Sequence, residues 1–265
     1  MKILEAVKNG RFAGINLKGL IGLLFAFNAI FNIITSILAP KGTPADQISP
    51  VVSVVVFILT LVFVLLSIFV QGGAFNIIKE YIKTGSKALA GFVNFGKKFY
   101  LRLLGVAVIL MVVLLLVAFL VVLVMALGFA SKNNMIGIVL GLIIGLVGLL
   151  FIFLLSLSPY AMVVEDISIF SSLRKSIDTV RNNFFKILGI FLFVLVLAFL
   201  SGLVIGLIVG ILSLIIKSFI AQQIISAILM SGLNAYVTVF ASTALMSYYL
   251  AITAGSPQKP ITQAT

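Results

Sequence analysis

Six long runs of apolar residues, separated by shorter polar segments, make up most of this 265-residue chain. Each run is long enough to supply the roughly 20 residues that an α-helix needs to cross a bilayer. The pattern therefore predicts an all-α integral membrane protein with six transmembrane helices. We place these spans at about residues 19–39, 51–78, 101–128, 135–164, 185–216 and 224–252.

The polar segments between the spans alternate in length and character. Connections after the first, third and fifth spans are short, and prolines from Pro40 to Pro50 force a non-helical turn in the first of them. The other connections are longer and, like the N-terminal segment, mix basic with apolar residues at helical spacing. These segments predict amphipathic helices at the lipid–water interface, at about residues 2–13, 86–99 and 168–183. The expected architecture is a single six-span domain over residues 1–256, followed by a tail over 257–265.

Composition supports lipid as the main solvent of the chain. With 63% hydrophobic and 9% charged residues, it lies far from the soluble average of about 25% charged residues. There is no cysteine, which excludes disulfides and thiolate metal sites, and no histidine, the commonest general base and metal ligand. We therefore expect no cofactor and no metal. We also expect no nucleic-acid partner, because no charge-rich soluble module carries the net charge of +12.

Basic residues are distributed unequally between the two sides of the predicted membrane domain. Of the 18 lysines and arginines, 15 lie on the side of the N-terminus and only Lys41, Lys132 and Lys217 on the other. By the positive-inside rule, this distribution predicts a multi-pass protein of the cytoplasmic membrane with both termini in the cytoplasm. We expect the first run to be an uncleaved span, because it exceeds the roughly 7–15 apolar residues of a signal peptide.

The fourth connection shows the amphipathic pattern most clearly. Phe170, Leu173, Ile177, Val180 and Phe184 recur at helical spacing, while basic residues take the other side. One interpretation is a helix whose basic side chains meet anionic lipid headgroups. The alternative is a docking surface for a partner protein. The residues expected to contact lipid headgroups or a partner are Lys97, Lys98, Arg102, Arg174, Lys175, Arg181 and Lys186.

Three basic residues mark a spacing that repeats along the chain. Lys18, Arg102 and Lys186 are separated by 84 residues each time, and each precedes a glycine near the start of a predicted span. This spacing suggests three copies of one unit, an interfacial amphipathic helix followed by a two-helix hairpin. Chance alignment of apolar sequence is the alternative explanation.

Glycines recur at every fourth residue in the fourth and fifth spans. Such a row lines one helix face and lets another helix backbone approach closely. Under the predicted topology both rows lie in the outer half of the membrane, which favours a contact between these two spans. A homodimer through either row is the alternative. The helix-packing positions are Gly137, Gly141, Gly145, Gly202, Gly206 and Gly210.

Polar residues within the predicted spans are few. Asn28 and Asn32 share one helix face, and their main interpretation is hydrogen bonding between helices. A lined cavity for a lipid or small solute is the alternative. Pro159 predicts a helix kink. No charged residue lies well within a span, apart from Lys217 near an outer boundary, which argues against an ion-coupled transporter.

Glu165 and Asp166 are the only adjacent carboxylates in the chain. A metal or catalytic pair is one interpretation, but such sites need more convergent ligands than these two residues supply. We therefore expect Arg102, Arg174 or Lys175 to neutralise them at the interface. We expect no catalytic residue, and the protein is predicted not to be an enzyme.

Several short motifs point to a known family. They are Pro159-Tyr160, Val164-Glu165-Asp166, Ser172-Leu173-Arg174-Lys175-Ser176 and Asn183-Phe184 through Gly189, with Gly72-Gly73 and Phe95-Gly96-Lys97-Lys98-Phe99-Tyr100 in weaker agreement. In these motifs the chain resembles the glycerophosphoryl diester phosphodiesterase membrane-domain family and related six-span prokaryotic membrane proteins of unassigned function. The resemblance implies a six-span fold and an association with lipids or the envelope. Some members carry a soluble phosphodiesterase barrel, which these 265 residues do not contain, so no catalytic residue is carried over.

Two functional hypotheses follow from these patterns. The first is a non-enzymatic multi-pass membrane protein that organises the membrane or handles lipid, with membrane lipids as its partners. The alternative is a permease or transporter subunit whose interfacial helices dock a soluble cytoplasmic subunit. A homo-oligomer is compatible with either hypothesis. A membrane enzyme that depends on Glu165 and Asp166 ranks last.

Overall fold

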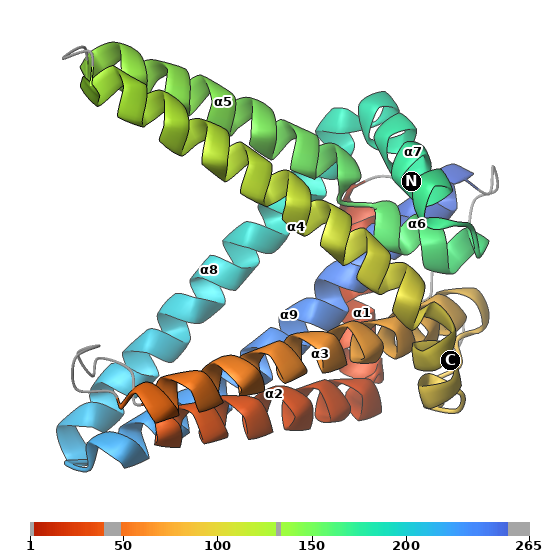
Figure 1. Ribbon diagram of the computed structural model, residues 1–265. Coiled ribbons are helices and arrows are strands. Elements are labelled where there is room, and N and C mark those ends of the chain that lie inside the picture. The colour runs from red at the N-terminus through yellow and green to blue at the C-terminus, as the bar shows by residue number, and fades with distance from the viewer. Residues whose placement is uncertain (1–2, 40–48, 131–133, 254–265) are drawn as a thin grey trace. The chain divides into compact units, whose positions relative to one another are not determined.

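The computed structural model describes residues 3–39, 49–130 and 134–253, and these residues form helices joined by short connections (Figure 1). No strand occurs among them. The predicted tail over 257–265 lies outside the described residues. The helices are α1 (Ile3–Asn16), α2 (Lys18–Leu38), α3 (Pro50–Thr84), α4 (Phe92–Ala130), α5 (Asn134–Leu155), α6 (Ser158–Glu165), α7 (Ile169–Asn182), α8 (Phe184–Ile215) and α9 (Phe219–Thr253).

Six segments of the described chain are long and apolar enough to cross a membrane: α2, α3, α4, α5 together with α6, α8, and α9. The predicted all-α integral membrane fold with six transmembrane helices is confirmed. The helices belong to two compact units, which are described separately below. The discontinuous unit consists of residues 1–98 and 185–265, and the central unit consists of residues 99–184.

Helix α9 is the centre of the discontinuous unit, because α1, α2 and α3 all pack against it. Every residue from Ser242 to Leu250 is buried. Between α2 and α9, the Asn32 Nδ2 donates a hydrogen bond to the Ser231 Oγ at 2.9 Å. The neighbouring Asn28 donates instead to the Leu24 carbonyl of its own helix, so only one of the two predicted asparagines joins helices in this way.

Helix α1 packs on α9 through small residues. Ala6, Gly10 and Ala13 are buried, and a Cβ added to Gly10 would lie only 2.8 Å from the Phe240 carbonyl oxygen. The interfacial helix expected at 2–13 thus extends to Asn16 and is held by a close backbone contact. Lipid gives helices little hydrophobic reason to associate, so small residues that permit such an approach matter more than in water.

The interfacial helix expected at about 86–99 is not a separate element. From Phe92 onward its residues continue without a break into the third span as α4. The breaks after α1 and α7 fall at Asn16 and Asn183, whose side-chain amides each donate to the backbone oxygen four residues earlier. Asparagine weakens helices by competing for backbone hydrogen bonds. Tyr100 stands 84 residues after Asn16 and Phe99 stands 84 residues before Asn183, and α4 continues through both positions.

In the central unit, α5 packs along α4 through its glycines. A Cβ added to Gly137 would lie 2.9 Å from the Gly128 Cα, and one added to Gly141 would lie 3.0 Å from the Met125 Cγ. A Cβ at Gly145 would be in ordinary contact with Val121, at 3.9 Å. The glycine row of the fourth span therefore serves helix packing within its own hairpin.

Contacts between successive copies of the predicted repeat recur with the 84-residue spacing. At the first junction, a Cβ added to Gly73 of α3 would lie 2.7 Å from the Phe92 carbonyl oxygen. Shifting Gly73 and Phe92 by 84 residues gives Leu157 and Ser176, and the Leu157 N–H donates to the Ser176 Oγ. The second helix of one copy thus meets the first segment of the next copy at the same register.

A third junction joins α9 to α1, the last helix of the third copy to the first helix of the first copy. Phe240 and Gly10 meet there. If residue 1 is counted as following residue 252, a further shift by 84 residues gives the positions expected at this junction. Phe240 and Gly10 lie within two residues of those positions. The first two junctions share one register and the third is displaced by up to two residues, so these contacts support the three-copy interpretation.

We expect Gly73→Val to lower the thermal stability of the solubilised protein and Gly206→Val to leave it nearly unchanged. The new side chain at Gly73 must displace the Phe92 backbone, and overpacking of this kind costs about 1–3 kcal/mol. No described atom lies within 4 Å of a Cβ added to Gly206, and both variants change helix propensity equally. Melting followed by circular dichroism measures the difference; equal midpoints would contradict the close contact.

Candidate functional site

The fourth predicted span is interrupted two residues before Pro159, within the central unit. Helix α5 ends at Leu155 and α6 begins at Ser158, with Pro159 in its first turn. Proline has no N–H, so it cannot bond the carbonyl of Leu155. The Ser158 Oγ donates to that carbonyl instead, at 2.7 Å. The predicted kink is therefore a break whose first lost hydrogen bond is replaced by the adjacent serine.

Helix α7 supplies the remaining hydrogen bonds of the break through Ser176. Its hydroxyl accepts from the Leu157 N–H at 3.1 Å and donates to the Leu154 carbonyl at 2.7 Å. Ser176 is completely buried. Because buried backbone groups without partners are costly in lipid, α7 must dock on the break for the break to be stable.

The docking face of α7 differs from the apolar stripe that the sequence predicts. Val180 of that stripe is buried, but Phe170 is 78% exposed, and the buried face consists mainly of small polar residues. Small side chains let α7 approach the break closely enough for a hydroxyl to reach the backbone. The buried residues of α7 are Ser172, Ser176, Thr179 and Val180.

The adjacent carboxylates are neutralised by basic residues of the central unit. The Arg102 Nη1 lies 2.7 Å from the Asp166 Oδ1, and the Lys175 Nζ lies 3.6 Å from the Glu165 Oε1. The prediction is confirmed for these two pairs, and Arg174 takes no part in them. Among the described residues, no group of three or more histidine, cysteine, aspartate or glutamate residues could hold a metal ion.

Asp166 has a backbone conformation that favours glycine. Its φ is 54°, and it caps the C-terminal end of α6 in the left-handed region. At the end of α3 the corresponding cap is Gly85, with a φ of 74°. An L-residue with a side chain is disfavoured there, and aspartate is among the few types that tolerate it. The carboxylate at this cap is therefore held in place next to Arg102.

A family profile described as "Domain of unknown function (DUF7847)" matches residues 1–252. The chain belongs to this family. Comparisons with curated proteins and with solved structures found no match. The resemblance to the glycerophosphoryl diester phosphodiesterase membrane-domain family is not tested by these comparisons and stays a prediction.

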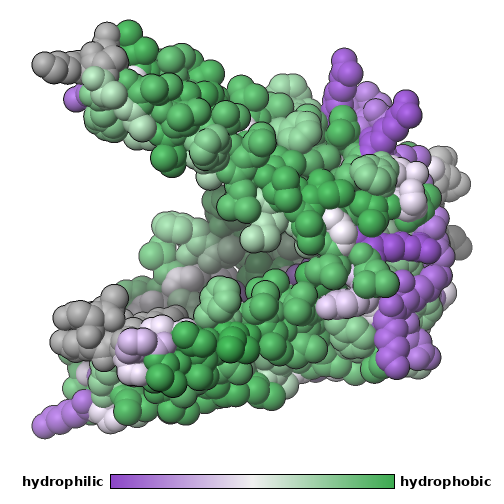
Figure 2. Space-filling view, viewed as in Figure 1, coloured by the Kyte–Doolittle hydropathy of each residue, from purple (hydrophilic) through white to green (hydrophobic). Residues whose placement is uncertain are grey.

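In this member of the DUF7847 family, the predicted headgroup-contact residues belong to both units. Lys97, Lys98 and Lys186 belong to the discontinuous unit and are exposed at the starts of α4 and α8. In the central unit, Arg102 and Lys175 are engaged in the ion pairs described above. Arg174 and Arg181 are exposed on α7, and neither forms an ion pair with a described residue. Figure 2 shows hydrophobic residues along the helices and hydrophilic residues gathered at helix ends.

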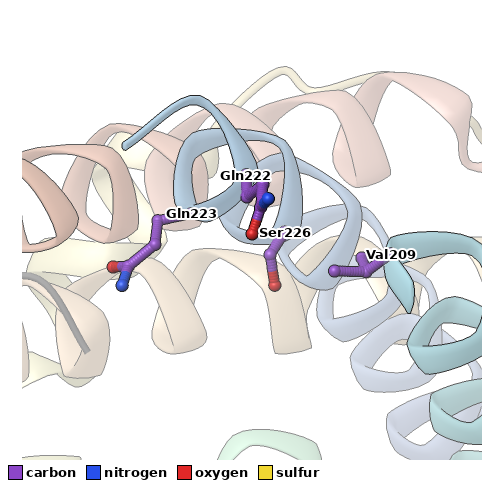
Figure 3. A pocket seen from close by; sticks show the side chains of 4 residues that line it. All are labelled: Val209, Gln222, Gln223 and Ser226. Atoms are coloured by element: carbon purple, nitrogen blue, oxygen red, sulfur yellow. The ribbon is translucent and has the colours of Figure 1, made fainter. Parts of the chain in front are cut away.

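The connection between α8 and α9 holds a small recess lined by Val209, Gln222, Gln223 and Ser226 (Figure 3). The Gln222 Nε2 donates to the Ile216 carbonyl at 2.5 Å and more weakly to the Ser213 carbonyl. These carbonyls lie at the end of α8 and just beyond it, where no further helical turn satisfies them. Gln222 therefore closes the connection between α8 and α9.

The glycine row of α8 has no neighbour in the described structure. No described atom lies within 4 Å of a Cβ added to Gly202, Gly206 or Gly210. These residues belong to the discontinuous unit, whereas the glycine row of α5 belongs to the central unit. The predicted pairing of the two rows stays a prediction.

Ser176, the residue that joins α7 to the fourth span, is not among the site residues predicted from the sequence. Its signal was present, because Ser172, Ser176 and Thr179 form a row of small hydroxyl residues at i, i+4 and i+7. Hydropathy places such residues on the solvated side of a helix. The nearby proline, which leaves backbone groups in need of partners, is the clue that assigns them to the buried side.

We expect Ser176→Ala to loosen the break. The variant leaves the Leu157 N–H and the Leu154 carbonyl without partners, and each unsatisfied buried group costs about 1–3 kcal/mol. Hydrogen–deuterium exchange should accelerate across 154–163 in the solubilised protein. Ser171→Ala, at an exposed position of the same helix, should leave the exchange unchanged. Equal protection in both variants would contradict the role given to Ser176.

Proposed function

We propose that this multi-pass membrane protein is non-enzymatic and organises lipid by binding anionic phospholipid headgroups through α7. The observation that carries the proposal is the exposed surface of α7. Arg174 and Arg181 have no ion-pair partner among the described residues, and the neighbouring Phe170 ring is 78% exposed. Basic and aromatic side chains side by side on one interfacial helix suit phosphates and acyl chains respectively.

The physical basis of the proposal is that α7 is fixed before lipid arrives. Ser176 and the Lys175–Glu165 pair hold the helix on the central unit, so little order has to be imposed on binding. Leu173 and Ile177 are half-buried, which leaves part of each side chain available to acyl chains. Each basic residue near an anionic bilayer surface contributes roughly 1 kcal/mol to the attraction.

We also propose that α7 lies in the cytoplasmic leaflet of the cytoplasmic membrane and that both termini are cytoplasmic. The support is the distribution of basic residues between the two sides of the chain. Asp178 is the only acidic residue of α7, against the three basic residues Arg174, Lys175 and Arg181. The proposed headgroup contacts and the proposed orientation therefore depend on some of the same residues.

The topology is testable because the chain has no cysteine. We expect a membrane-impermeant maleimide to label Ser218→Cys, between α8 and α9, in intact cells. Ser171→Cys, on α7, should react only after the cells are permeabilised. Both positions are exposed, so accessibility of the thiol depends on the side of the membrane. The reverse labelling pattern would refute the proposed orientation.

Local enrichment of anionic lipid tests the proposed function. We attach a fluorophore to Ser171→Cys in reconstituted vesicles and compare quenching by brominated phosphatidylglycerol with quenching by brominated phosphatidylcholine. We expect the anionic lipid to quench more, and added salt to reduce the difference. R174Q/R181Q should lower the enrichment by roughly thirtyfold, since two charges that contribute roughly 1 kcal/mol each are lost.

The control is the same fluorophore at Ser218→Cys, where both brominated lipids should quench alike. Equal quenching at Ser171→Cys in the unsubstituted background would refute headgroup binding by α7. A soluble protein that co-purifies stoichiometrically and is released by Phe170→Glu would favour the permease-subunit alternative instead.

A further inference from the structure

The three basic residues at 84-residue intervals occupy related structural positions. Each lies within one helical turn of a glycine that packs against the first segment of the next copy. Counting the first copy as the one that follows the third, each copy has such a contact, but Gly19 comes one residue after its basic residue whereas Gly105 and Gly189 come three residues after theirs. The glycine–aliphatic pairs are Gly19 with Leu89, Gly105 with Ile169, and Gly189 with Ile3. We call each of these basic residues, together with its glycine–aliphatic pair, a corner, so that Lys18, Arg102 and Lys186 define three corners.

Among the described residues, the corner of the second copy is the one whose cation forms an ion pair. There the Asp166 carboxylate meets the Arg102 guanidinium at 2.7 Å. Asp166 holds this position from a left-handed cap, a conformation for which α3 uses glycine. The second copy thus has a carboxylate at a cap where glycine is the unstrained choice, and that carboxylate faces the corner cation.

The other two corners have a cation but no corresponding carboxylate. Positions 84 residues before and after Asp166 are Ile82 and Leu250. Lys18 and Lys186 are exposed, and neither forms an ion pair with a described residue. The corner with a carboxylate has arginine and the corners without one have lysine, a point charge that is among the common phosphate-binding side chains.

We propose that a phosphate of an anionic phospholipid occupies, beside Lys18 and beside Lys186, the place that the Asp166 carboxylate takes beside Arg102. This inference rests on the proposed function, in which basic residues of the chain meet lipid phosphates. The surroundings favour a lipid over a free anion. The Phe185 ring next to Lys186 is 83% exposed and Ile15 near Lys18 is 51% exposed, so acyl chains have apolar contacts at both corners.

Native mass spectrometry of the full chain, released from nanodiscs of phosphatidylcholine and phosphatidylglycerol, tests the proposal by counting retained phosphatidylglycerol. Lys18→Gln and Lys186→Gln should each retain one molecule fewer than the unsubstituted protein. Asp166→Asn should retain one more, because Arg102 then lacks its internal anion. Asparagine tolerates the left-handed cap, so the fold is kept. R102Q/D166N should lose that gain, and Lys217→Gln, which changes none of the three corner residues, should change nothing.

The proposal is overturned if Asp166→Asn gains no phosphatidylglycerol or if both lysine variants retain the full number. It is also overturned if inorganic phosphate, added to nanodiscs of phosphatidylcholine alone, binds beside the same lysines with the same variant pattern, since the ligand is then a free anion. The α7 quenching assay is independent of these counts. Normal quenching with unchanged counts refutes only the corner sites, while altered counts with no quenching difference refute only the role of α7.

Discussion

In hydrocarbon, a backbone N–H or C=O without a partner inside the protein has no water to bond, and this constraint governs the whole structure. It explains why long helices make up most of the described chain, and it is most demanding where a helix stops inside the membrane region. At the break before Pro159, Ser158 bonds one freed carbonyl and Ser176 of α7 bonds a second carbonyl and an N–H. Helix α7 therefore supplies hydrogen bonds that the fourth span lacks at its break. Because the break lies next to Pro159, the position of α7 depends on this proline.

This linkage has consequences for any ligand that binds the exposed side of α7. Because one hydroxyl on the opposite face bonds the span at two points, α7 cannot lift or rotate without leaving polar backbone groups unsatisfied. Arg174 and Phe170 are therefore presented in a set arrangement. A ligand that stabilises this arrangement also stabilises the break, and one that displaces α7 opens it. The surface and the interior of the central unit are energetically coupled through Ser176.

The spans could be predicted from the sequence because hydropathy reports how apolar each segment is, and long apolar runs are stable only in lipid. The side chains that form hydrogen bonds with the spans could not be predicted in this way. Hydropathy assigns Ser176 to the solvated side, although it is completely buried, because the pattern records polarity and not the unsatisfied backbone that serine serves. The continuity of α4 was not predicted, because basic residues before a span suggest an interfacial helix whether or not the helix is interrupted there. The ion pairs of Glu165 and Asp166 were predictable, since two adjacent carboxylates near an apolar span require nearby cations.

The three copies differ most where the second helix of each copy ends. The corresponding helices therefore have different structural roles. Glu165 corresponds to Tyr81 and Tyr249, which are buried, whereas Glu165 and Asp166 are charged and paired. Helix α6 therefore ends early in a charged cap, and α7 docks beside it. Helices α3 and α9 extend further, with tyrosines packed inside the discontinuous unit. In the second copy, Asp166 pairs with the corner cation Arg102, and the Lys175–Glu165 pair helps to hold α7 in place. The other two copies have a tyrosine and an aliphatic residue at those positions, and their corner lysines form no ion pair with a described residue.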